Sequence, residues 1–141
     1  MKELSVKEVE YIAFRLAKEL MAFHEPIPDF SSRFPNVLES CLAAPFYTFS
    51  GKSVYEGMIR KAAVLFYVMI KNHPFQNGNK RIAMTTLLVF LHKNSRWLTV
   101  DAQEFYTFTI WVAQSPAKCK EEILTSIEKF IKRNLVLAGK S

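Results

Sequence analysis

Two apolar segments that flank a short polar cluster constrain this chain most strongly. Residues 62–70 (AAVLFYVMI) and 82–92 (IAMTTLLVFLH) are separated by HPFQNGNKR, residues 73–81. Segments that are apolar nearly all round are typical of helices at the centre of a domain. The sequence therefore predicts two packed central helices, with its densest polar cluster in the turn between them.

Capping signals divide the rest of the chain into further helices. Three pairs have the spacing of a capping box, which marks a helix start: Ser5 and Glu8, Ser53 and Glu56, and Asp101 and Glu104. Ser115 before Pro116 fits the start of a last helix. Helices are predicted near residues 5–22, 36–44, 53–71, 79–93, 101–114 and 116–135.

Two of these helices have a clear apolar face, because their apolar residues lie three and four apart. In the first helix the predicted face is formed by Tyr11, Ile12, Leu16, Leu20 and Met21. In the last helix it is formed by Ile123, Leu124, Ile127, Phe130, Ile131 and Leu135. Between helices, PFYTFSGK at residues 45–52 predicts a short hairpin or flap. We expect an all-α fold, a single domain over residues 1–141 with about six helices.

Composition narrows the class of protein. Half of the 141 residues are hydrophobic and the net charge is +6, which favours a folded chain with an anionic partner. No signal peptide or membrane span is predicted, and the two cysteines have no metal-like spacing, so we expect a cytoplasmic location. Nucleic-acid binding is the weakest hypothesis. The basic residues are dispersed along the chain, as expected of an ordinary solvated surface.

A turn explains only part of the polar cluster. Asn77 and Gly78 form a common turn dipeptide, and Asn79 is a common helix cap. Lys80 and Arg81, however, fall in a first helical turn, where the helix dipole disfavours cations. Cations fit there if a phosphate binds the backbone N–H groups of the helix start. Gly78 would allow close approach, and Arg81 could bind two phosphate oxygens.

His73 stands at the edge of this expected anion site. Imidazole titrates near neutral pH, so it can accept a proton from an incoming hydroxyl. Phe75 is expected to point inward and anchor the loop. A histidine base beside a phosphate site indicates group transfer from a nucleotide to a hydroxyl.

The segment HPFQNGNKR resembles the signature of the Fic/Doc family, H-x-F-x-[DE]-G-N-[GK]-R. The resemblance covers most of the chain, including the helix that ends in KNHPF, the flap-like PFYTFSGK and the segment TTLLVFLHKN. Lys80 stands where the Fic branch usually has glycine, which looks like the Doc branch. Members of that branch are small toxins of toxin–antitoxin pairs.

The resemblance implies a role for each motif residue. His73 would deprotonate a serine, threonine or tyrosine hydroxyl on a target protein, and Gly78, Asn79, Lys80 and Arg81 would hold the phosphates of ATP. In the Fic branch the target receives AMP, and in the Doc branch it receives the γ-phosphate. The known Doc target is a translation factor, elongation factor Tu. The resemblance therefore implies a Doc-like kinase with an antitoxin partner, and Fic-type AMP transfer is the alternative.

Two positions depart from the family pattern. Asn77 stands where the family has the acidic residue that holds Mg²⁺, and an amide oxygen lacks the charge that this cation prefers. Met84 stands where many Fic enzymes have a second arginine. A Fic-fold binding protein with weakened catalysis is therefore a further alternative.

Overall fold

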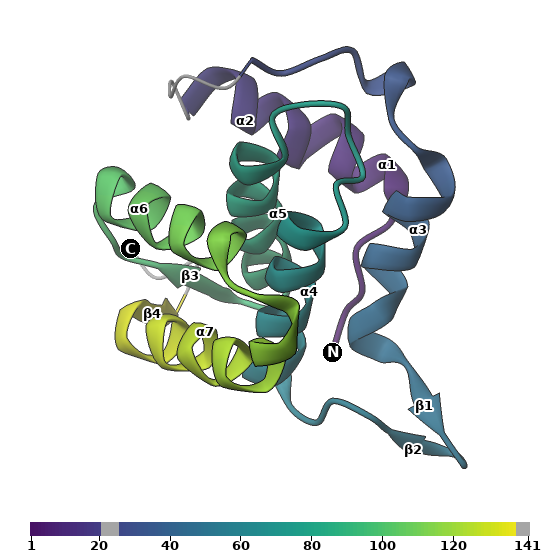
Figure 1. The fold of residues 1–141 in the computed structure, drawn as a ribbon, viewed down its shortest axis with the longest axis vertical. Coiled ribbons are helices and arrows are strands. Elements are labelled where there is room, and N and C mark those ends of the chain that lie inside the picture. Colours follow the sequence, from purple (N-terminus) through teal and green to yellow (C-terminus); the bar gives the residue numbers. More distant parts are fainter. Residues whose placement is uncertain (21–25, 138–141) are drawn as a thin grey trace.

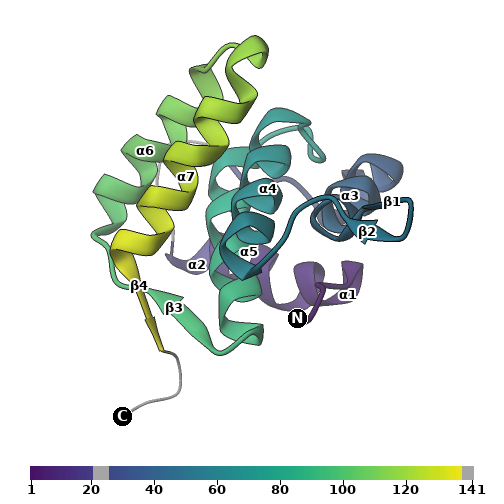
Figure 2. The same ribbon diagram turned by 90° about the horizontal axis from the view of Figure 1, so that it is seen from below.

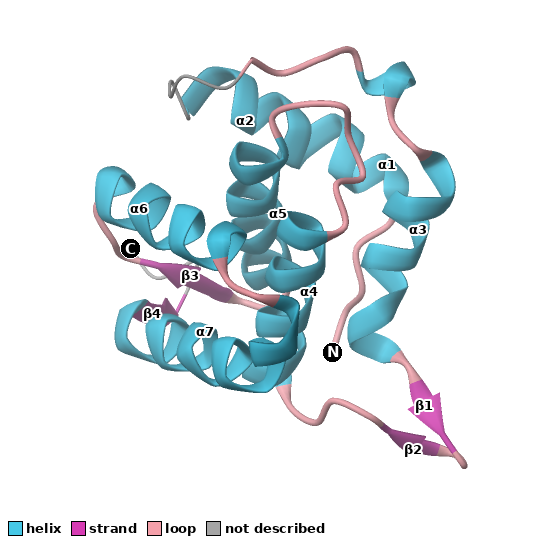
Figure 3. Cartoon of the chain, in the orientation of Figure 1, coloured by secondary structure: helices cyan, strands magenta, loops and turns pink. Residues whose placement is uncertain are grey.

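The computed structural model describes residues 1–20 and 26–137, and its helices form three layers (Figures 1 and 2). The central layer contains α4 (Met58–Lys71) and α5 (Asn79–Lys93), side by side. On one side lie α6 (Ala102–Gln114) and α7 (Lys120–Asn134), and on the other side lie the N-terminal helical segment and α3 (Pro35–Ala43). In the part of the chain that the structure describes, strands are confined to two short pairs (Figure 3), so the expected all-α fold is confirmed.

The central pair is buried as predicted. Every residue from Lys61 to Ile70 in α4, and from Arg81 to Leu91 in α5, is shielded from solvent. Thr85 of α5 is fully buried. Its hydroxyl has a hydrogen-bond partner there, because it donates to the carbonyl oxygen of Ala13 at 2.8 Å. No helix in residues 1–20 and 26–137 combines the length and the apolar character that a membrane span requires.

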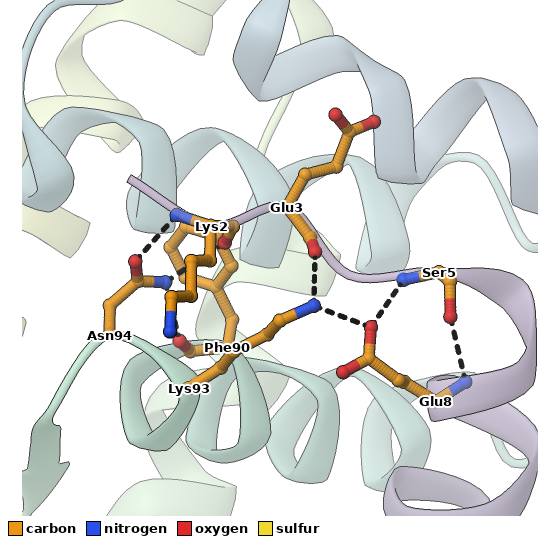
Figure 4. A network of polar contacts seen from close by, with 7 residues as sticks. All are labelled: Lys2, Glu3, Ser5, Glu8, Phe90, Lys93 and Asn94. Carbon is orange, nitrogen blue, oxygen red and sulfur yellow. Dashed lines mark hydrogen bonds and ion pairs between the residues drawn. The ribbon is translucent and has the colours of Figure 1, made fainter.

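The N-terminal segment begins at the predicted capping box. The N–H of Glu8 donates to the hydroxyl of Ser5 at 3.1 Å, and the N–H of Ser5 donates to the Glu8 carboxylate at 2.9 Å (Figure 4). Asn94 and Lys93 at the end of α5 also hold this segment, through the backbone of Lys2 and Glu3. The chain therefore starts against the C-terminal end of α5.

The predicted apolar face of the first helix is only partly correct, because Leu16 packs against the core but Tyr11 and Ile12 do not. The segment runs through α1 (Val6–Glu8), a π-helical stretch (Val9–Phe14) and α2 (Arg15–Leu20). Tyr11 and Ile12 are 55% and 49% exposed. The buried residues of this stretch are Val9, Ala13 and Phe14. A π-helix places more residues in each turn than an α-helix, so an α-helical period assigns the wrong face. The predicted helix end and Met21 lie outside the described residues.

The expected hairpin forms before α4, but the predicted start of α4 is wrong. Strands β1 (Thr48–Phe49) and β2 (Lys52–Ser53) pair antiparallel. The helix begins at Met58 after Gly57, and Ser53 is not its cap. The Ser53 hydroxyl instead donates to the Tyr55 carbonyl at 2.8 Å and accepts a 2.9 Å hydrogen bond from Lys61. These two hydrogen bonds take the place of the expected cap.

The C-terminal region confirms α6 and corrects the bounds of α7. Asp101 caps α6 by accepting the N–H of Glu104 at 3.1 Å. A 3₁₀ turn (Ala117–Cys119) precedes α7, so this helix starts later than Pro116. Leu135 falls beyond the helix, in β4 (Leu135–Leu137), which pairs antiparallel with β3 (Arg96–Leu98). Further 3₁₀ turns are Phe30–Ser32 and Ala44–Phe46.

Candidate functional site

The loop between α4 and α5 is anchored in the core by Phe75. This side chain is 1% exposed, and its ring centroid lies 5.6 Å from that of Phe14 and 5.7 Å from that of Phe30. The N–H of Phe34 donates to the Pro74 carbonyl at 2.9 Å. Contacts from the N-terminal third of the chain therefore fix the middle of the loop.

Asn79, the first residue of α5, ties the two ends of the loop together. Its side-chain oxygen accepts the N–H of Phe75 at 3.0 Å, and its Nδ2 donates to the Phe75 carbonyl at 2.8 Å. The same Nδ2 lies 3.4 Å from Nδ1 of His73. Asn79 is 7% exposed, so a buried amide connects the helix start to the candidate base.

His73 occupies an unusual backbone conformation. Its φ is 51°, in the left-handed region, which few residues other than glycine adopt. Such conformations persist where surrounding contacts hold them, and they cluster at functional sites. The His73 side chain is exposed, in contrast to the buried Phe75 two residues later.

A pocket of about 250 Å³ opens beside His73. Its lining residues are Ile70, His73, Gln76, Asn77, Gly78, Asn79, Lys80 and Ala113. The structure thus brings the predicted base together with four predicted site residues at the N-terminal end of α5. Helix N-termini attract anions through their N–H groups and dipole, so the pocket has the electrostatic character of a phosphate site.

Gly78 is required by packing as well as by backbone conformation. Its φ is 72°, and a Cβ atom placed there would lie 2.8 Å from both the Pro26 carbonyl oxygen and Cδ1 of Ile27. The segment after α2 therefore lies directly against the start of α5. Glycine at this position serves the fold whether or not a phosphate also approaches it.

Arg81 is placed differently from the other motif residues. Its side chain is 6% exposed and does not line the pocket; Nη2 donates to the Ala17 carbonyl at 2.6 Å. Arg81 therefore connects the start of α5 to the backbone of α2. Its predicted phosphate contact would need a different side-chain conformation. Met84 is fully buried and belongs to the core.

Asn77 is exposed, and its side-chain oxygen accepts the N–H of Gly78 at 3.1 Å. Within the described residues, no three His, Cys, Asp or Glu side chains gather where they could hold a metal ion. The pocket lining includes no carboxylate. The neutral amide oxygens of Gln76 and Asn77 are a poor match for Mg²⁺, which proteins usually bind through one or two carboxylates.

Sequence reasoning missed two residues that shape the site. Lys71 donates to the carbonyls of Ala113 and Ser115, at 3.1 and 2.5 Å, and so holds the end of α6 against the pocket. A lysine in the last turn of a helix was the available signal. Cys41 lies beneath the loop start, where burial raises the pKa of its thiol to about 11 although a hydrogen bond with Asn72 works to lower it.

Comparison with known proteins places this geometry in a family. The model of the Fic/DOC family matches residues 4–91. A curated relative, the toxin Doc of Mycolicibacterium smegmatis, is 35% identical over 65 residues, which cover 46% of this chain and 50% of the relative. The chain thus spans about half the length of the curated relative it matches. No solved structure gives a significant match. The chain belongs to the Fic/Doc family, as the motif from His73 to Arg81 implies.

Proposed function

We propose that this protein is a Doc-like toxin that transfers the γ-phosphoryl group of ATP to a hydroxyl side chain of a target protein. Family membership and the similarity to a Doc toxin support this proposal. Lys80, in place of the glycine usual in the Fic branch, favours phosphoryl transfer over AMP transfer. The observation that carries the proposal is that His73 and the start of α5 line one pocket.

The pocket suits the phosphates of ATP better than the whole nucleotide. Its volume of about 250 Å³ lies below the roughly 300–1,000 Å³ of pockets that enclose small ligands. The N-terminal end of α5 and the charge of Lys80 would bind the phosphate oxygens. The nucleoside would then extend beyond the pocket.

The transfer step uses the imidazole of His73 as the base. His73 takes the proton from the target hydroxyl, whose oxygen forms a bond to the γ-phosphorus. The bond between the γ-phosphorus and the β,γ-bridging oxygen breaks, and ADP leaves with that electron pair. Positive groups around the phosphates stabilise the charge on the oxygens during transfer. Because the pocket residues do not fit Mg²⁺, we assign no step to a metal ion.

The partners follow from the same proposal. The target carries a serine, threonine or tyrosine hydroxyl, and by resemblance to the Doc branch a translation factor is the first target to test. A separate antitoxin protein would neutralise the activity, and both partners would be cytoplasmic. The net charge of +6 is suited to acidic partners.

A second candidate, a Fic-fold binding protein with lost catalysis, is favoured by Asn77. This residue is neutral, and its oxygen already accepts the Gly78 N–H. If weak metal binding is the cause of low activity, Asn77→Asp should raise transfer at least tenfold, because it restores a charged oxygen beside the phosphates. A binding protein would show nucleotide affinity without transfer in either variant.

Transfer can be tested with ATP labelled at the γ- or the α-phosphate, incubated with the protein and a bacterial lysate. The proposal expects a labelled lysate protein only with γ-label, and loss of the label in His73→Ala. His92→Ala is the matched control, because His92 is also exposed but lies at the far end of α5. Label from α-ATP alone would identify AMP transfer. Absence of both labels, also in Asn77→Asp, would reject an enzyme.

A further inference from the structure

The side-chain amide of Asn79 has a defined orientation. Its oxygen accepts from the backbone N–H of Phe75 and its nitrogen donates to the carbonyl of the same residue, at 3.0 and 2.8 Å. Turning the amide over would place oxygen against oxygen and nitrogen against N–H, and both hydrogen bonds would be lost. The group that faces His73 is therefore the NH₂ group, which can only donate.

This orientation fixes which nitrogen of His73 carries the proton. Nδ2 of Asn79 has two hydrogens; one is directed to the Phe75 carbonyl, and the other can reach Nδ1 of His73, 3.4 Å away. Nδ1 must then provide a lone pair, so the neutral ring carries its hydrogen on Nε2. The contact is partly buried, because Asn79 is 7% exposed whereas the His73 side chain is exposed.

We propose that Asn79 is a positioning residue that holds resting His73 as the Nε2–H tautomer. In this state Nε2 is a hydrogen-bond donor, and the lone pair needed by a general base lies on Nδ1 beside Asn79. His73 has a φ of 51°, a left-handed backbone conformation that the surrounding contacts of the loop must hold. For Nε2 to accept a proton from a target hydroxyl, the contact with Asn79 must open so that the hydrogen can move to Nδ1. This consequence rests on the proposed function; the tautomer itself does not.

The tautomer can be measured without nucleotide or target, in the full chain with ¹⁵N-labelled histidine. Long-range ¹H–¹⁵N spectra above the titration of the ring distinguish the two nitrogens, and His73→Ala assigns the signals. We expect His73 to be mainly Nε2–H in the wild type. Asn79→Ala removes the donor. The ratio of Nε2–H to Nδ1–H should then fall about fivefold, which is the change in an equilibrium constant expected from the loss of one hydrogen bond. Asn79→Asp offers an acceptor and should lower the ratio further.

Asn94 provides the matched control. Its amide also accepts a backbone N–H and donates to a carbonyl of one residue, Lys2, at 2.7 and 3.0 Å (Figure 4). Asn94→Ala should leave the His73 ratio unchanged. The proposal is overturned if wild-type His73 is mainly Nδ1–H, a result that needs no variant to fold. It is also overturned if a folded Asn79→Ala keeps the wild-type ratio. Neither result bears on whether His73 supports transfer, which the labelling experiment decides.

Discussion

The guanidinium of Arg81 donates a 2.6 Å hydrogen bond to the carbonyl oxygen of Ala17 and so ties the start of α5 to the last turn of α2. Four residues later in α5, the hydroxyl of Thr85 donates to the carbonyl of Ala13, which lies four residues before Ala17, at 2.8 Å. Two side chains of α5 therefore donate hydrogen bonds to two carbonyl oxygens of the N-terminal segment. This contact stabilises the surroundings of the pocket independently of any nucleotide.

Replacing Arg81 should therefore lower stability. Arg81→Met leaves the buried Ala17 carbonyl without this donor, and we expect a loss of about 1.5–3 kcal/mol in the free energy of unfolding, measured by urea denaturation. Arg96→Met is the control, because Arg96 bonds the carbonyl of the neighbouring Ser95 at the surface. Equal stability of Arg81→Met and the wild type would show that the Ala17 contact contributes nothing.

Gly78→Ala separates packing from backbone strain. Both Gly78 and Gly51 have positive φ, 72° and 77°, so alanine is strained at either position. At Gly51 nothing lies within 4 Å of the added Cβ, whereas at Gly78 Pro26 and Ile27 are in its way. We expect Gly78→Ala to cost about 1–3 kcal/mol more unfolding free energy than Gly51→Ala. Equal costs would mean that the Pro26–Ile27 segment moves aside freely.

The features predicted correctly from sequence are those set by neighbours in the chain. The capping box at Ser5 and the buried helices α4 and α5 follow from local spacing and apolar periodicity. The hydrogen bond from Arg81 to Ala17 is not predictable from sequence, because the two residues lie 64 positions apart and no pattern connects them. The cap expected at Ser53 does not form, because α4 begins only at Met58 and the Ser53 hydroxyl bonds Tyr55 and Lys61 instead. The π-helical stretch was not predicted, because a search with the period of the α-helix assigns its residues to the wrong faces.

Lys61 should control the order of the β1–β2 hairpin. Lys61 is 8% exposed, and its ammonium group donates to the Pro45 carbonyl before the hairpin, the Ser53 hydroxyl in β2 and the Tyr55 carbonyl after it. Lys61→Met keeps an unbranched apolar side chain but removes the ammonium group and with it all three hydrogen bonds. We expect hydrogen exchange across residues 47–55 to accelerate at least tenfold, because this segment has few other buried contacts. Lys52→Met, in the exposed strand β2, is the control and should leave exchange unchanged.

If hydrogen exchange across residues 47–55 were equally fast in Lys61→Met and in the wild type, the strands would hold the hairpin without help from α4. The Ser53→Ala variant removes only one of the acceptors. It should therefore give an intermediate rate.

Thiol reactivity should differ between the two cysteines. Cys41 is 1% exposed, and burial raises its pKa from 9.0 to about 11, which leaves about a hundredfold less thiolate at pH 8 than in an ordinary thiol. Cys119 is partly exposed. An aromatic disulfide reagent should modify Cys119 first, and Cys41 should react at the rate of unfolding. Comparison of Cys41→Ala with Cys119→Ala assigns the phases; fast labelling of Cys41 in the folded protein would contradict this order.

Glu8 should make stability depend on pH. Burial works to raise the pKa of this carboxyl, but the hydrogen bonds from Lys93 and Ser5 and the charge of Lys93 together lower it below its ordinary 4.5. A carboxyl with a lowered folded pKa stabilises the protein fully above the unfolded value and loses this effect as the pH falls through the folded value. With the Lys93–Glu8 pair at 2.7 Å and about a third exposed, we expect about 1 kcal/mol.

The measurement is the difference in unfolding free energy between the wild type and Glu8→Gln at pH 7, 5, 4 and 3. Glutamine can still accept the Ser5 N–H, so the difference reports the charge at the capping box. It should be constant from pH 7 to 5 and shrink from pH 4 to 3. Glu10→Gln, in the same segment, controls for the change in net charge. A difference that grew on acidification would reverse the sign of the shift and contradict the Lys93 contact as its source.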